Sequence, residues 1–322
     1  MTAYSYTMNM SDNFQVSASM IEQIYAVRNA FLSCSFTRTS QSGTVGLCSV
    51  DDLSDTSKIL GHSSSQQLVT TDIFAFGDSW QATNPLYIKV SYVVGAKNWH
   101  LRTDWSMGSV HNGSGSLTGV DTLTIIGQSQ DSANDASVPT SGTTVWAGGD
   151  GSAIALMTFP QHGGSNFYGV ASWVVFERFY DSNGQPTGSG FHMIGVPCGT
   201  FNGVAVTRTV RSQASLYGTA PATQEVGAGC VPNARPSSVP ALYDGRLVLG
   251  LIYPMAGVPQ NPSPNILLGN TTDLSIAYQT FPYTVYGTTR TYRNVSNRYD
   301  DSTTGPRVSN IYTDGRWALR AD

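Results

Sequence analysis

Apolar and polar positions alternate over short segments along most of the chain, and one stretch near the start follows a helical period instead. The stripe at this helical spacing consists of Ile21, Ile24, Tyr25, Arg28, Phe31 and Leu32. Ser19, followed three residues later by Glu22, forms a capping box, which marks the start of a helix. The sequence therefore predicts one amphipathic helix that begins at Ser19.

Strand periodicity is clearest between residues 86 and 92. Apolar side chains occupy positions 86, 88, 90 and 92, whereas Lys89 and Ser91 are polar. An alternation with period two places one set of side chains on each face of a strand. We expect Ile88 and Val90 to point into the core.

A β-hairpin is predicted for residues 167–196. The segments "FYGVASWVVFERFY" and "GFHMIGV" are joined by "DSNGQPTGS", in which Asn183-Gly184 favours a tight reversal with positive φ. Further strand candidates are "DTLTIIGQ", "GSAIALMTF", "RLVLGLIY" and "LSIAYQTF". Their irregular spacing indicates a mainly β protein with a β-sandwich or jelly-roll body, one N-terminal helix and extended terminal arms.

From Phe281 onward, Arg and Tyr recur without the apolar period of a core element. We interpret this segment as an extended arm that lies across an adjacent subunit; the alternative is a disordered tail. The sequence thus divides into an N-terminal arm and helix (1–60), a β-sandwich body (61–280) and a C-terminal arm (281–322). The expected subunit-interface residues are Tyr283, Tyr286, Tyr292, Arg293, Arg298, Tyr299 and Trp317.

Composition adds a second indication of assembly. Charged residues make up 12 % of the 322 residues, about half of the roughly 25 % in average proteins, while hydrophobic residues make up 40 %. Such a surface suits a subunit of an oligomer, because charges are depleted from interface centres. The alternative is a secreted β protein with an uncharged, Ser/Thr-rich surface. The net charge of −4 favours neither nucleic acid nor an acidic membrane as a partner.

The ends and the cysteines set further expectations. The first residues lack the basic and apolar segments of an export signal, so we expect the chain to stay in the compartment where it is made. Cys34, Cys48, Cys198 and Cys230 are widely spaced, which predicts reduced and mostly buried thiols.

Asp51, Asp52 and Asp55 lack the alternating ligands of a calcium loop, and no glycine-rich loop completes a phosphate-binding motif. We expect no metal and no cofactor.

The stretch Gly77-Asp78-Ser79 resembles the nucleophile motif of the SGNH (GDSL) serine hydrolases. The resemblance implies a late Asp-x-x-His and a Gly-x-Asn-Asp block, yet none of the five histidines has Asp three residues before it. A serine without its base is not activated. We therefore expect no enzyme, with Ser79 in a turn whose backbone donors Asp78 caps; an SGNH-like esterase is one alternative function. Sugar stacking on Trp80, Trp99 or Trp105 in a receptor-binding domain is another.

The same region resembles a recurrent segment of tailed-bacteriophage virion proteins. It runs from Phe76 through Asp78-Ser79, Gln81-Ala82-Thr83 and Pro85 into a strand and then a Gly-rich stretch, about residues 73–119. The family pattern ends its strand in Tyr-Gly, whereas Tyr92-Val93-Val94-Gly95 stands here. The resemblance implies a non-enzymatic structural protein of the tail, baseplate or neck, made and assembled in the bacterial host cytoplasm. Its expected partners are copies of itself and other virion proteins, with a cell-surface glycan as a further possibility.

Overall fold

The computed structural model describes residues 4–8, 17–39, 44–45, 48–49, 67–94, 101–113, 116–118, 143–160, 172–196, 200–201, 204–205, 211–216, 222–225, 230–231, 242–243, 246–247, 249–269, 279–295, 299–301, 305–307 and 317–322. These residues form one α-helix and many antiparallel strands. The prediction of a mainly β protein with an N-terminal helix is confirmed.

The helix α1 spans Ser17–Ser33, so it begins two residues before the expected cap at Ser19. Its buried side is formed by Ile24, Val27, Arg28, Ala30 and Phe31. Tyr25 and Leu32 were expected on this side but are 42 % and 48 % exposed. Positions 24, 27, 28 and 31 already fill the stripe that faces the core, which leaves positions 25 and 32 at its outer edge. The Ile21 side chain lies outside the described residues.

The N-terminal sheet has the order β2 (Thr37–Thr39), β5 (Gln67–Ala75), β6 (Tyr87–Val94) and β7 (Leu101–Gly108). Ile88, Val90 and Tyr92 on β6 are fully buried, whereas Lys89 and Ser91 are partly exposed. The predicted strand and its facing are confirmed. A 3-10 helix, η2 (Ser79–Ala82), lies in the connection between β5 and β6.

The middle sheet has seven strands. Their order is β1 (Tyr4–Met8), β10 (Thr143–Gly149), β11 (Ala153–Pro160), β12 (Ser172–Tyr180), β13 (Pro186–Val196), β16 (Arg211–Leu216) and β17 (Ala222–Glu225). Strands β12 and β13 form the predicted hairpin. Gly184 supplies the positive φ of its turn, 75°, and two backbone N–H groups of the turn donate to the Asp181 carboxylate.

The C-terminal sheet has the order β21 (Leu249–Leu251), β24 (Ile266–Gly269), β29 (Trp317–Arg320), β26 (Thr288–Val295) and β25 (Thr280–Val285). A smaller sheet consists of β18 (Cys230–Val231), β22 (Tyr253–Ala256) and β23 (Val258–Pro259). The remaining strands pair two by two: β3 (Thr44–Val45) with β4 (Cys48–Ser49), β8 (Val110–His111) with β9 (Leu117–Thr118), β14 (Thr200–Phe201) with β15 (Val204–Ala205), β19 (Leu242–Tyr243) with β20 (Arg246–Leu247), and β27 (Tyr299–Asp301) with β28 (Gly305–Arg307).

The other strand candidates have mixed outcomes. The segment "GSAIALMTF" forms β11, as predicted. The segment "RLVLGLIY" is divided among β20, β21 and β22, and of "LSIAYQTF" only Thr280 and Phe281 are in a described strand, β25. Residues 121–128 lie outside the described residues.

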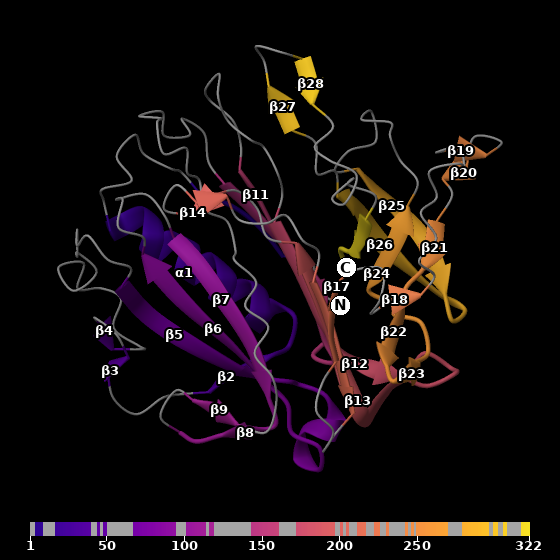
Figure 1. The fold of residues 1–322 in the computed structure, drawn as a ribbon, viewed down its shortest axis with the longest axis horizontal. Helices are drawn as coiled ribbons and strands as arrows, with labels where there is room; N and C mark the ends of the chain where they lie inside the picture. The colour runs from indigo at the N-terminus through magenta and orange to yellow at the C-terminus, as the bar shows by residue number, and fades with distance from the viewer. Residues whose placement is uncertain are drawn as a thin grey trace.

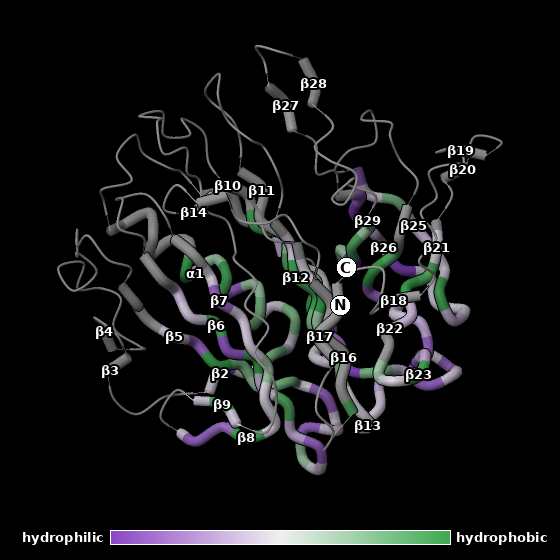
Figure 2. Tube along the Cα trace, in the orientation of Figure 1, coloured by the Kyte–Doolittle hydropathy of each residue, from purple (hydrophilic) through white to green (hydrophobic). Residues whose placement is uncertain are grey.

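Three layers build the molecule, with the middle sheet flanked by the N-terminal sheet and α1 on one side and by the C-terminal sheet on the other (Figure 1). Successive side chains of β12 enter different cores: Val174 and Phe176 pack with α1, whereas Trp173 and Val175 pack with the C-terminal sheet. Both faces of the middle sheet are therefore buried at β12. Apolar colouring accordingly runs along β12 and along the inner parts of both flanking layers (Figure 2).

The C-terminal segment differs from the expected extended arm. Residues 281–322 contribute β26, β29 and most of β25, and β29 pairs with β24 from the expected body. Tyr292 and Trp317 are 0 % and 4 % exposed inside their own chain. The buried side chains of this segment follow no apolar period, because they include the polar Asn294 and the four consecutive residues 317–320, yet they complete a core.

Candidate functional site

The central strand β12 carries two adjacent charged residues, Glu177 and Arg178, in an otherwise apolar run. Both are fully buried. Because neighbouring residues of a strand point to opposite faces, Glu177 faces the C-terminal sheet and Arg178 faces the N-terminal sheet. A buried charge requires a partner, so each of these two residues defines a polar cluster at one layer boundary.

Arg178 pairs with the aspartate of the Gly-Asp-Ser stretch. Its Nε lies 2.5 Å from Asp78 Oδ2, and the guanidinium carbon lies 5.2 Å from the centre of the Phe76 ring. Gln81 Oε1 accepts a longer bond of 3.4 Å from the same guanidinium. The other carboxylate oxygen of Asp78 accepts the Trp80 N–H and caps η2, as predicted. Asp78 thus connects η2 to the middle sheet.

Gly77 is needed for close backbone packing. Its N–H donates to the Gly151 carbonyl at 2.9 Å, and a Cβ at this position would lie 1.8 Å from the Ser35 carbonyl oxygen. Ser35 has a left-handed φ of 65° and ends α1, where the Phe36 N–H returns to the Phe31 carbonyl. The end of the helix, the η2 connection and the β10–β11 turn therefore meet at Gly77.

Ser79, the residue that corresponds to the hydrolase nucleophile, is exposed at the start of η2. Among the described residues, no histidine is hydrogen-bonded to it. His192 lies on the opposite face of the middle sheet from Asp78 and contacts Glu177. His62, His100 and His162 lie outside the described residues.

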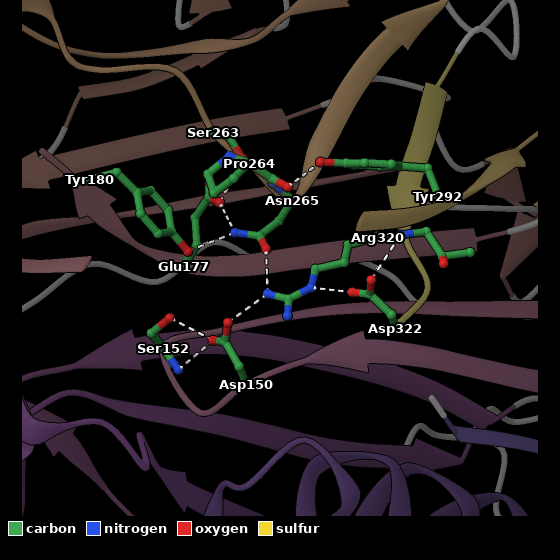
Figure 3. Close-up of polar contacts among 11 residues, drawn as sticks. Asp150, Ser152, Glu177, Tyr180, Ser263, Pro264, Asn265, Tyr292, Arg320 and Asp322 are labelled. Carbon is green, nitrogen blue, oxygen red and sulfur yellow. Dashed lines mark hydrogen bonds and ion pairs between the residues drawn. The ribbon is translucent and has the colours of Figure 1, made fainter. Parts of the chain in front are cut away.

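Glu177 is surrounded by polar groups of the middle sheet and of the loop before β24. Its Oε2 accepts hydrogen bonds from Ser263 Oγ at 2.6 Å and Asn265 Nδ2 at 2.7 Å (Figure 3). Its Oε1 lies 2.9 Å from Nδ1 of His192, the cross-strand partner on β13. All four side chains are completely buried.

Asn265 extends this cluster to the end of the chain. Its Oδ1 accepts a bond from Arg320 Nη1 at 3.2 Å, and the same Nη1 lies 2.7 Å from Asp150 Oδ2 (Figure 3). Arg320 Nε donates to Asp322 at 2.8 Å. Asn265 Nδ2 also contacts the Tyr180 hydroxyl at 2.7 Å. The network thus connects the middle sheet, the loop before β24 and β29.

The surroundings of Asp150 and Tyr180 shift the pKa values of both side chains. Burial by itself would raise the pKa of Asp150, but Arg320 and the Ser152 donors hold it below its usual value. Burial raises the pKa of the Tyr180 hydroxyl, and the negative charges of Glu177 and Asp150 raise it further. The carboxylate of Asp150 is therefore held in its charged form and the Tyr180 hydroxyl in its neutral form.

A third ionic cluster connects α1 to the N-terminal sheet. Asp72 of β5 is fully buried, and its two oxygens contact Arg28 Nε at 2.6 Å and Arg38 Nε at 2.7 Å. Burial and the nearby Asp72 charge raise the pKa of the Tyr92 hydroxyl. This pair is buried, as is Asp78–Arg178, whereas the Asp150 side chain of the Asp150–Arg320 pair is 36 % exposed.

The way in which the side chains of these clusters contact one another limits the chemistry that they can perform. Ser263, Glu177 and His192 include the residue types of a catalytic triad, but a triad requires the histidine to contact the serine. Here the glutamate stands between them, and all three residues are fully buried. Within the described ranges, no group of three His, Cys, Asp or Glu side chains is placed to hold a metal ion. Nor does any described helix combine the length and apolar character needed to cross a bilayer.

The predicted interface residues contact their own chain where the structure describes them. Tyr286 donates to the Pro262 carbonyl and Tyr292 to the Pro264 carbonyl, at 2.8 and 2.6 Å. Arg293 lies 4.3 Å from the Trp146 ring centre, and Trp317 packs against Trp173. Tyr283 is partly exposed beside Tyr292. Arg298 and the side chain of Tyr299 lie outside the described residues. A subunit contact through this set stays a prediction.

Sequence reasoning did not identify the Glu177 cluster. The available signal was the pair Glu177-Arg178 inside the apolar strand "SWVVFERFY", because a charge in a buried strand requires a partner. The identity of those partners was not accessible, since Ser263 and Asn265 lie 86 and 88 residues further along the chain.

A scan of the chain against models of protein families finds no match, and a comparison with curated proteins finds none either.

Proposed function

We propose that this protein is a non-enzymatic structural component of a bacteriophage virion, from the tail, baseplate or neck, that assembles through contacts between subunits. The segment 73–119 supports the virion assignment by its resemblance to tailed-phage proteins. In this proposal the chain is made and assembled in the cytoplasm of the bacterial host, and its partners are copies of itself and other virion proteins.

The observation that carries the proposal is that the chain has few charged residues and buries several of them. The chain has 17 basic and 21 acidic residues, and Arg28, Asp72, Glu177, Arg178 and Arg320 are each 4 % exposed or less. These five side chains are used inside the fold and add no charge to the outer surface, on a chain that has few charges to begin with. Charge-poor, Tyr-containing surfaces are typical of subunit contacts, where desolvating a charge is costly.

The buried clusters also favour a structural role over catalysis. The Asp78–Arg178 and Asp150–Arg320 pairs each join two layers, and Arg28–Asp72 joins α1 to the N-terminal sheet. Catalytic groups must reach substrate, whereas four of these six residues are 4 % exposed or less and each contacts its partner. A rigid three-layer block suits a protein that transmits load between neighbours.

Two measurements test the proposal. Cryo-electron microscopy of the parent particle should show density for this fold in repeated copies, and light scattering should show a closed oligomer alone or with partner subunits. A chain that is monomeric in solution and missing from the particle would contradict the assembly role. Hydrolysis of a small chromogenic ester by the wild type that disappears in Ser79→Ala would contradict the non-enzymatic role.

A further inference from the structure

Trp80 in η2 is a large aromatic side chain that the fold holds at the surface. It is 38 % exposed, yet its Nε1–H donates to the Pro186 carbonyl at 2.9 Å. The backbone N–H of the same residue donates to Asp78, which is itself paired with Arg178. Both the backbone and the indole edge are therefore fixed, and the exposed ring loses little conformational freedom when it binds a ligand.

Gly188 on β13 gives the indole its position. A Cβ at residue 188 would lie 2.5 Å from Trp80 Cε3 and 2.9 Å from Asn84 Oδ1. The missing side chain lets the six-membered ring of the indole and the Asn84 amide lie directly against the strand. The aromatic surface that remains exposed is therefore on the side of the ring that points away from β13.

The surroundings of this ring are polar, and the two acidic residues that adjoin them, Asp78 and Asp181, accept hydrogen bonds from the backbone of η2 and of the β12–β13 turn. Residues 79–87 and 182–191 contain no Asp, Glu, Lys or Arg. The exposed neighbours along the chain are Ser79, Ala82 and Thr83, and the exposed Gln185 directly precedes Pro186. Hydroxyl and amide groups can both donate and accept hydrogen bonds, so they suit a ligand rich in hydroxyl groups.

We propose that Trp80 is the stacking platform of a binding site for a neutral pyranose sugar. The apolar C–H face of such a ring packs on the exposed indole face, and its hydroxyl groups exchange hydrogen bonds with Ser79, Thr83 and Gln185. A protein-binding hot spot has several apolar side chains around its anchor, whereas the exposed neighbours of Trp80 are almost all polar. This site is independent of the proposed assembly role.

The experiment uses the full chain and two probes, methyl β-galactopyranoside and methyl α-glucopyranoside. The indole N–H resonance of Trp80 is identified as the one that disappears in Trp80→Phe. We expect at least one probe to shift this resonance with a dissociation constant in the millimolar range, as for a small neutral ligand. Saturation transfer to the sugar should fall at least tenfold in Trp80→Ala and less in Trp80→Phe, which keeps a smaller ring.

Val258→Ala is the matched control, because Val258 is 60 % exposed on β23 and outside the proposed site. It should bind the probe as the wild type does. Three results would overturn the proposal: no shift with either sugar, equal binding by Trp80→Ala, or an effect of Trp80→Ala on oligomer mass with no effect on sugar binding. The last result would identify a subunit contact instead. If Trp80→Ala melts early, Trp80→Phe and the wild type still decide between these outcomes.

Discussion

Replacing Asp78 by asparagine tests whether the Gly-Asp-Ser stretch serves the fold. The Asp78–Arg178 pair is 2.5 Å long, and its side chains are 7 % and 0 % exposed. Asparagine keeps the oxygen that accepts the Trp80 N–H, but it removes the charge and replaces Oδ2, which accepts the Arg178 Nε–H, by an NH2 donor. Breaking a buried ion pair from one side costs about 3–5 kcal/mol, because the other charge stays buried without its counterion. Gln81 and the Phe76 ring still face the guanidinium, so we expect a loss near the lower end, about 3 kcal/mol.

The loss should be measured by urea unfolding and by calorimetry. At roughly 2 °C per kcal/mol for a chain of this size, the melting temperature should fall by about 6 °C. Ser79→Ala is the control, since Ser79 is exposed and its change should stay within about 0.5 kcal/mol. The double variant Asp78→Leu/Arg178→Met should regain most of the loss, because it leaves no charge unpaired. An Asp78→Asn protein as stable as the wild type, or a double variant less stable than Asp78→Asn, would refute this reasoning.

Four further outcomes are expected. Ser35→Gly should raise the free energy of unfolding by about 1 kcal/mol, because the φ of 65° disfavours a side chain, and Ser35→Ala in the same urea titration should not. Burial raises the pKa of Cys34 to about 12, so native wild type and Cys34→Ala should show the same thiol count with a thiol reagent near neutral pH. The pKa of Asp150 is lowered from its unfolded value of 3.8, so the charged carboxylate adds stability above pH 3.8 that is lost as the pH falls through the folded pKa. In unfolding measured as a function of pH, Asp150→Asn should therefore lose less stability at acid pH than the wild type does. Trp317→Ala should cost about 3–5 kcal/mol in thermal unfolding, whereas a Trp317 that served only an arm would leave the melting temperature unchanged.

Local periodicity predicted the elements whose contacts follow a simple pattern. Ile88 and Val90 alternate with polar residues, and both are buried on β6 as expected. It was harder to predict which residues of α1 point into the core, because Tyr25 and Leu32 are apolar and lie next to the buried stripe. Periodicity gives the direction of an apolar face but not its width, which depends on how closely the neighbouring sheets approach.

The C-terminal sheet was missed because its pairing is not local. Trp317 on β29 pairs with Leu268 on β24 and with Val295 on β26, so neither neighbour is close in the sequence. On the edge strand β25, buried and exposed positions do alternate, but the partly buried ones include Phe281 and Tyr283 between Thr and Pro. This pattern is difficult to distinguish from an aromatic arm without knowledge of the partner strand.

Glu177 and Arg178 are neighbours in the C-terminal half of β12, and they link the few charges of this chain to its three-layer fold. Two apolar sheets can pack in several registers at similar free energy, since apolar contact is not directional. A buried carboxylate with three polar contacts, or a guanidinium against one aspartate, is satisfied in only one register. We infer that Glu177 and Arg178 fix the position of the two outer layers on the middle sheet more than they stabilise it, because desolvation offsets much of their attraction. On this reasoning, apolar replacements of Asp78 and Arg178 should retain stability but broaden the amide spectrum of η2, whose position the pair defines.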